Sequence, residues 1–118
     1  MALLAVPISC ELFNLARAEK SLILGQGKAA NLARMRAERL NGGLRLYRAD
    51  KCMYVTGGEG CLVSRSSTDG YIFSFKGGQP GWQQRKPMEP TVQTTIIISA
   101  DAETIIDVPY NGPIKEFK

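Results

Sequence analysis

The fold of this chain is decided by the stretch 22-LILGQGKAANLARMRAERLNGG-43, which holds an apparent break between two helical patterns and the stop that follows them. Residues 28–40 are rich in alanine, leucine and arginine, which favour helix, and Asn41-Gly42-Gly43 is typical of a helix C-terminus. Upstream of Gly25-Gln26-Gly27, residues 9–24 place apolar side chains on one helical arc: Leu12, Leu15, Ala16, Leu22 and Ile23. Two helices joined by about three residues are expected to lie antiparallel.

After Gly43 the apolar period changes from that of a helix to that of a strand. Residues 44–47 and 52–55 have the alternation of short strands. Helices followed by strands without intervening helices predict an α+β fold. We therefore expect a single α+β domain over residues 1–118, with an N-terminal antiparallel helix pair packed on one face of an antiparallel sheet of about four to six strands.

The clearest hairpin joins residues 61–66 to residues 71–76. A three-residue loop with Gly70 in the left-handed conformation would pair Ser67 with Tyr71. In this register, the expected core face of the two strands comprises Cys61, Val63, Phe73 and Phe75. Ile72, Ser74 and Lys76 are expected to face away from the core. A second hairpin, β-branched throughout, is expected from residues 91–99 and 104–108, ending at Pro109.

The chain has no histidine among its 118 residues, and this absence narrows the chemistry. It excludes Ser–His and Cys–His nucleophile pairs, histidine-ligated zinc and an imidazole proton shuttle. No pair of carboxylates has a spacing that indicates a glycosidase or a metal site. We predict no catalytic residue, no metal and no cofactor, so an enzyme ranks third among the function classes.

Three cysteines, Cys10, Cys52 and Cys61, leave at least one thiol free and lack C-x-x-C spacing. A Cys52–Cys61 disulfide is conceivable across a hairpin, but buried free cysteines are the favoured interpretation. The apolar residues 1–10 are too short to cross a bilayer and lack the basic start of a signal peptide. These observations favour a cytoplasmic protein without a membrane span.

Positive charge is concentrated between Lys28 and Lys51, where seven basic and two acidic residues give a net +5 within a chain of net +4. Gly25-Gln26-Gly27-Lys28 is a weak candidate anion site, since glycines before a helix can expose backbone N–H groups. The candidate anion-binding residues are Gly25, Gly27, Lys28, Arg34, Arg39, Arg45 and Arg48. A solvated face is the alternative explanation for this charge.

Two charges interrupt the apolar arcs, Glu19 in the first helical pattern and Arg36 in the second. An unpaired buried charge is costly, so we expect the two to pair across the helix hairpin.

The lone tryptophan, Trp82, lies in the long loop of residues 77–90. Long loops in small domains often carry function, and aromatic residues beside arginine are frequent interface anchors. The alternative is that Trp82 folds back against the core. The candidate protein-binding residues are Trp82, Arg85 and Tyr47.

These observations favour a small non-enzymatic binding or regulatory domain that contacts a protein partner or a second copy of itself. The alternative is a nucleic-acid-binding module that uses the basic residues 28–51, although no helix-turn-helix, zinc finger or RNA-binding aromatic motif is evident.

Overall fold

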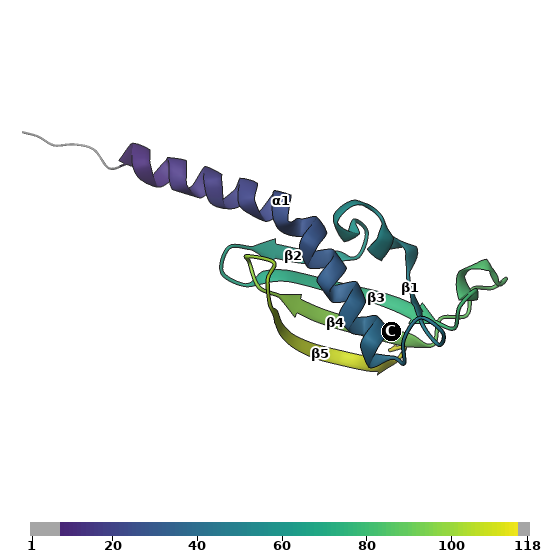
Figure 1. Cartoon of the computed structure of the whole chain (residues 1–118). Coiled ribbons are helices and arrows are strands. Elements are labelled where there is room, and N and C mark those ends of the chain that lie inside the picture. The colour runs from purple at the N-terminus through teal and green to yellow at the C-terminus, as the bar shows by residue number, and fades with distance from the viewer. Residues whose placement is uncertain (1–7, 116–118) are drawn as a thin grey trace, which may run out of the picture.

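The computed structural model describes the backbone of residues 8–115 and the side chains of residues 16–115. Its main feature is one unbroken helix, α1 (Ile8–Leu40), which crosses one face of a sheet and extends beyond it at its N-terminal end (Figure 1). The predicted antiparallel helix pair is therefore wrong. The predicted stop is right: α1 ends at Leu40, and Gly42 and Gly43 follow with positive φ angles. Residues 1–7 of the apolar N-terminal stretch lie outside the described part of the chain.

The helix continues through Gly25-Gln26-Gly27 because the buried residues before and after these glycines lie on the same face of one helix. Leu22, Ala29, Ala33 and Ala37 are all buried, and their spacings of seven, four and four residues keep them on one stripe. Two glycines cost about 1 kcal/mol each in a helix interior, and packing of this stripe on the sheet outweighs that cost. The expected Glu19–Arg36 pair is also wrong, because the two residues lie 17 positions apart on one helix, about 25 Å along its axis.

Five antiparallel strands form the sheet: β1 (Arg48–Ala49), β2 (Leu62–Ser66), β3 (Gly70–Gly78), β4 (Val92–Ile98) and β5 (Ile105–Pro113). The central strands follow the order β3-β4-β5. Strands β1 and β2 share the other edge of β3, with β2 along its first half and β1 along its end. The predicted α+β class and antiparallel sheet are confirmed.

The segment between β1 and β2 differs from the prediction. Neither predicted strand forms: residues 44–46 form a turn, and residues 52–54 belong to the 3₁₀ helix η1 (Lys51–Tyr54). A second 3₁₀ helix, η2 (Thr56–Gly58), follows it. A disulfide between Cys52 and Cys61 closes this excursion, with the two Cα atoms 5.9 Å apart. The prediction of free thiols at Cys52 and Cys61 is wrong. The cysteines therefore no longer support a cytoplasmic location.

The β2–β3 hairpin confirms the predicted core face of β3. Phe73 and Phe75 are buried, Ile72 is half-buried and Lys76 is exposed. The predicted pairing is wrong: Ser66, not Ser67, starts the hairpin opposite Gly70, which has the expected left-handed φ. A bulge between Leu62 and Ser64 then turns Val63 to solvent.

Strand β5 continues through Pro109 to Pro113, where the sequence predicted an end. The pairing with β4 shifts between Thr95 and Ile97, which lie opposite Tyr110 and Asp107. Pro109 falls in this irregularity on an edge strand, where a missing N–H costs no sheet hydrogen bond.

The core lies between α1 and one face of the sheet. Its largest fully buried side chains include Tyr47, Tyr71, Phe73, Ile96 and Ile98. Small alanines on α1 allow the helix to approach these large residues closely.

Candidate functional site

Residues 16–21 of α1 are mostly exposed. From Leu22 to Ala37 the inward face of α1 is buried, whereas Ala16, Glu19 and Lys20 are exposed. Glu19 lies on the same helical stripe as Leu22 but beyond the sheet, which explains how a charge sits on an apolar arc. The helix thus continues past the sheet that covers its inward face between Leu22 and Ala37.

A groove lies where α1 leaves the sheet, between the helix and β2. It comprises two cavities of about 440 Å³ and 600 Å³ on either side of Arg65, which bonds to Gln26 across the groove. Ile23 borders both cavities, and the side chains of Ile23 and Leu24 are 56% and 73% exposed. Leu62 of β2, half-buried, lines the larger cavity opposite Ile23 and Leu24.

The anion site predicted at Gly25-Gln26-Gly27-Lys28 is not formed. These residues lie inside α1, so their backbone N–H groups are engaged in the helix rather than presented at an N-terminus. Lys28 forms an exposed ion pair with Glu103, which contributes little to stability.

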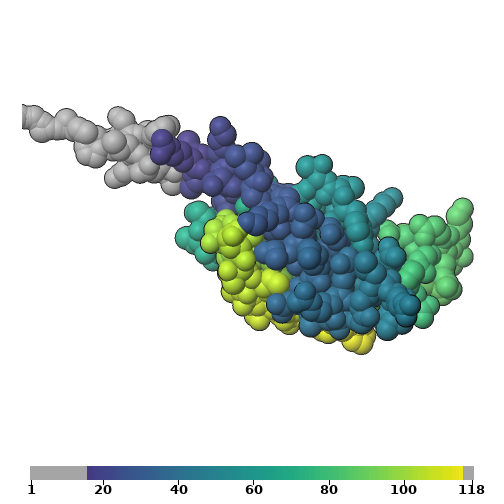
Figure 2. Space-filling view, viewed as in Figure 1, coloured from purple at the N-terminus to yellow at the C-terminus, as the bar shows by residue number. Residues whose placement is uncertain are grey.

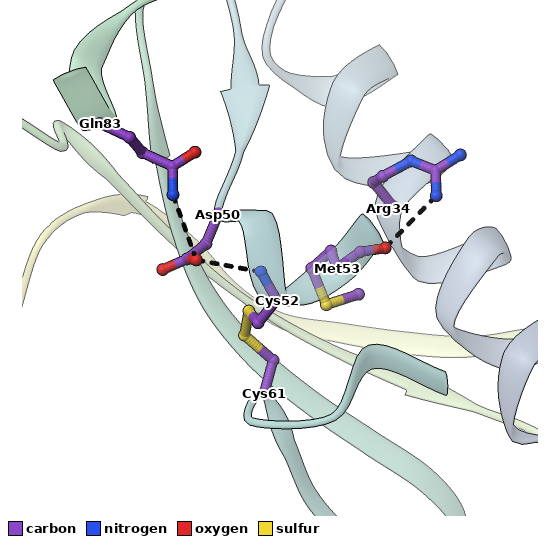
Figure 3. The surroundings of a disulfide bond; sticks show 6 residues. All are labelled: Arg34, Asp50, Cys52, Met53, Cys61 and Gln83. Carbon is purple, nitrogen blue, oxygen red and sulfur yellow. Dashed lines mark hydrogen bonds between the residues drawn. A yellow bond between two sulfur atoms is a disulfide. The ribbon is translucent and has the colours of Figure 1, made fainter. Parts of the chain in front are cut away.

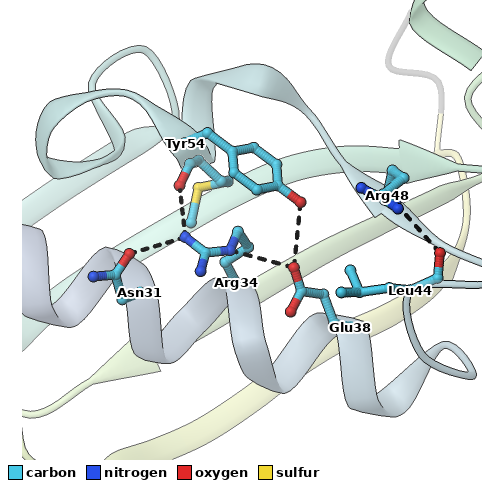
Figure 4. A network of polar contacts seen from close by, with 7 residues as sticks. Asn31, Arg34, Glu38, Leu44, Arg48 and Tyr54 are labelled. Atoms are coloured by element: carbon cyan, nitrogen blue, oxygen red, sulfur yellow. Dashed lines mark hydrogen bonds and ion pairs between the residues drawn. The ribbon is translucent and has the colours of Figure 1, made fainter. Parts of the chain in front are cut away.

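The predicted basic residues divide into two groups. Arg34 belongs to a partly buried network: it donates to the Glu38 carboxylate at 3.3 Å and to Asn31 at 2.9 Å, and its guanidinium lies 4.8 Å from the centre of the Tyr54 ring (Figure 4). The Tyr54 hydroxyl donates to Glu38, and partial burial together with that carboxylate raises the pKa of Tyr54. This network joins α1 to η1, so the role of Arg34 is structural.

Arg39, Arg45 and Arg48 form the second group and remain exposed. Arg48 donates weakly to the Leu44 carbonyl at 3.3 Å. These three residues lie at the end of the molecule where α1 finishes, together with Lys51 on η1.

Two of the three predicted protein-binding residues are buried. Trp82 is 3% exposed and its indole N–H donates to the Arg48 carbonyl at 2.8 Å, so the ring folds back against the edge of the sheet. Tyr47 is buried with its ring against Gly77, and burial raises the pKa of its hydroxyl. Arg85 is exposed and forms an ion pair with Glu89 at 3.0 Å.

The sequence did not indicate the polar frame around the disulfide. Asp50 accepts a hydrogen bond from the Cys52 N–H at 3.1 Å and a longer one from the Gln83 amide at 3.4 Å (Figure 3). Arg34 also donates to the Met53 carbonyl. These contacts fix residues 50–61 to both α1 and the Trp82 loop. The one local signal in the sequence is Asp50 itself, because aspartate is a preferred N-cap residue.

The described residues hold no group of three or more potential metal ligands from His, Cys, Asp and Glu side chains. Within the same part of the chain, no helix has the length and apolar character needed to cross a membrane.

Comparisons with protein-family models, with curated proteins and with solved structures gave no significant match. The functional argument therefore rests on the surfaces described above. Among them is the groove where α1 leaves the sheet, which has the exposed Ile23 and Leu24 beside its larger cavity.

Proposed function

We propose that this chain is a non-enzymatic assembly domain that associates with further copies of itself through the N-terminal half of α1 and the adjoining groove. The observation that carries the proposal is a helix that continues beyond its sheet and leaves Ile23 and Leu24 exposed beside a cavity where it departs.

An isolated helix segment of about 14 residues is only marginally stable in water, because few tertiary contacts offset the loss of chain entropy. Residues 8–21 of α1 form such a segment, and the sequence pattern predicts that Leu12 and Leu15 fall on the helical arc of the buried Leu22. A second helix packed along this arc would supply the missing contacts.

The groove extends this apolar surface onto the sheet domain. Ile23 and Leu24 on α1 are exposed there, and Leu62 on β2 lines the larger cavity. Glu19 and Arg65, of opposite charge, border the same cavity. A surface that carries both an apolar arc and opposite charges is self-complementary in chemistry, as an interface between identical copies requires.

The test is sedimentation velocity on the full chain over a concentration series, comparing it with Leu12→Gln/Leu15→Gln. Glutamine keeps the helix propensity of leucine while removing its apolar contacts. The matched control is Asn14→Gln/Ser21→Gln, which changes two residues on the opposite side of the same helix.

We expect the parent chain and the control to associate, and the leucine variant to have a dissociation constant at least tenfold higher with an unchanged melting temperature of the sheet domain. A parent chain that stays monomeric at several hundred micromolar would contradict the proposal. Equal association of all three proteins would show that the interface between copies does not involve Leu12 and Leu15 of α1.

A further inference from the structure

The net charge of the molecule is concentrated at the end opposite the projecting part of α1. Residues 39–51 and 79–89 carry six basic and two acidic side chains, a net +4, which equals the net charge of the whole chain. The rest of the chain is therefore balanced. We name this region the basic end: Arg39, Arg45, Arg48, Lys51, Arg85 and Lys86.

Printed contacts join the two segments of the basic end into one surface. The Trp82 indole bonds to the Arg48 carbonyl, and the Gln83 amide bonds to Asp50 beside Lys51. The space-filling view shows the end of α1, the following turn and the Trp82 loop together at one end of the molecule (Figure 2). The convergence could not be predicted from the sequence because 27 residues separate the two segments.

The acidic residues in these two segments are already engaged. Asp50 caps η1 and Glu89 pairs with Arg85. The side chains of Arg39 and Arg45 make no hydrogen bond or ion pair with the described residues and are exposed. At Arg39 and Arg45 the surface therefore presents positive charge that is not paired with a carboxylate of the described residues.

Large apolar side chains are interleaved with these cations. Leu44 and Leu46 flank Arg45 in the turn after α1 and are 48% and 65% exposed, and Leu40 is 47% exposed in the last turn of the helix. The turn thus presents leucine, arginine and leucine in succession to solvent.

We propose that the basic end binds the surface of a bilayer that contains anionic lipid. Phosphate headgroups would pair with the guanidinium groups, and the boundary of the acyl chains would take the leucine side chains, as at other peripheral membrane surfaces. Nucleic acid would satisfy the charge as well, but its backbone offers no apolar region for Leu44 and Leu46. The mixture of side chains therefore favours lipid.

This proposal goes beyond self-association and uses a different end of the molecule. The test is co-sedimentation of the full chain with vesicles of neutral phosphatidylcholine and with vesicles containing about a third phosphatidylglycerol. The charge variant is Arg39→Gln/Arg45→Gln, the apolar variant is Leu44→Ser/Leu46→Ser, and the matched charge control is Lys20→Gln/Lys28→Gln on α1. Anisotropy with a labelled DNA duplex runs in parallel.

We expect binding to the anionic vesicles only, weakened by salt. The charge variant should lower the partition coefficient roughly thirtyfold, since each basic residue near an anionic surface contributes about fivefold. The apolar variant should also lower it, and the control should lower it much less. The leucine variant Leu12→Gln/Leu15→Gln should leave vesicle binding by the monomer unchanged.

Three results would overturn the proposal. Equal binding to neutral vesicles would show that charge is not recognised. If the Leu12→Gln/Leu15→Gln variant loses vesicle binding while the basic-end variants keep it, the projecting helix and not the basic end contacts the lipid. DNA binding that depends on the arginines but not on Leu44 and Leu46, without vesicle binding, would assign the basic end to nucleic acid.

Discussion

The Tyr71 hydroxyl donates a hydrogen bond to the Leu22 carbonyl at 2.5 Å, and this contact explains the glycine that interrupts the helical pattern. A Cβ atom on Gly25 would lie 2.8 Å from that hydroxyl oxygen, whereas a Cβ atom on Gly27 would meet nothing within 4 Å. The first glycine is required by the approach of β3 to α1, and the second is not.

The two glycines should therefore respond in opposite directions to alanine. Gly27→Ala should raise the free energy of unfolding by about 0.5–1 kcal/mol, because alanine is the better helix former. Gly25→Ala should lower it by about 1–2 kcal/mol, since overpacking displaces the Tyr71 ring. Urea unfolding measures both, and equal stabilisation by the two substitutions would contradict a close Tyr71 contact.

The core face of β3 gives the second prediction. Phe73 is fully buried, so Phe73→Ala should cost about 3–5 kcal/mol of unfolding free energy. Val63→Ala on the neighbouring strand is the control and should change stability by less than about 0.5 kcal/mol, because the β2 bulge turns Val63 outward. Comparable losses in both variants would mean that the bulge is absent in solution.

The sequence predicted strands β2 to β5 and the helix stop better than it predicted the helix itself or the segment between β1 and β2. The α+β class, the antiparallel sheet and the buried Phe73 and Phe75 follow from period-2 alternation and turn chemistry. The prediction of two helices is wrong because the low helix propensity of Gly25 and Gly27 matters less than the common helical phase of the apolar residues on either side of them. Leu22, Ala29, Ala33 and Ala37 stay in register across Gly25 and Gly27, and that unbroken phase was present in the sequence.

The remaining errors come from contacts between distant residues. Trp82 is buried because it meets the Arg48 carbonyl 34 residues away, and no local pattern indicates such a partner. The gathering of Arg39 and Arg45 with the Trp82 loop depends in the same way on tertiary structure. The Cys52–Cys61 pair was missed because the intervening residues form two 3₁₀ helices rather than a hairpin.

Burial of Trp82 predicts a loss of stability on truncation. Trp82→Ala should lower the free energy of unfolding by about 3–5 kcal/mol, whereas Trp82→Phe should remove chiefly the indole hydrogen bond, about 1 kcal/mol. Native Trp82 fluorescence should be blue-shifted and protected from iodide. A red-shifted, readily quenched emission would place the ring in solvent and restore it as an interface anchor.

The disulfide gives a prediction that thiol counting can check. When the chain is denatured without reductant, one thiol should titrate, that of Cys10. When the denatured chain is also reduced, three thiols should titrate. Cys52→Ser/Cys61→Ser should lose about 2–3 kcal/mol of unfolding free energy, the order of magnitude for closing a short loop. Three reactive thiols in the denatured, unreduced chain would show that the cysteines are free.

Tyr47 makes stability depend on high pH. Burial raises the pKa of Tyr47 in the folded chain, whereas in the unfolded chain its hydroxyl ionises near its ordinary value of about 10. Above that pH the unfolded state binds fewer protons than the folded state, so the free energy of unfolding must fall as pH rises. Urea unfolding between pH 8 and 11 should show this fall, and Tyr47→Phe should make it shallower because the variant has no hydroxyl to ionise. Parallel pH curves for the parent chain and Tyr47→Phe would mean that the Tyr47 hydroxyl reaches water in the folded protein.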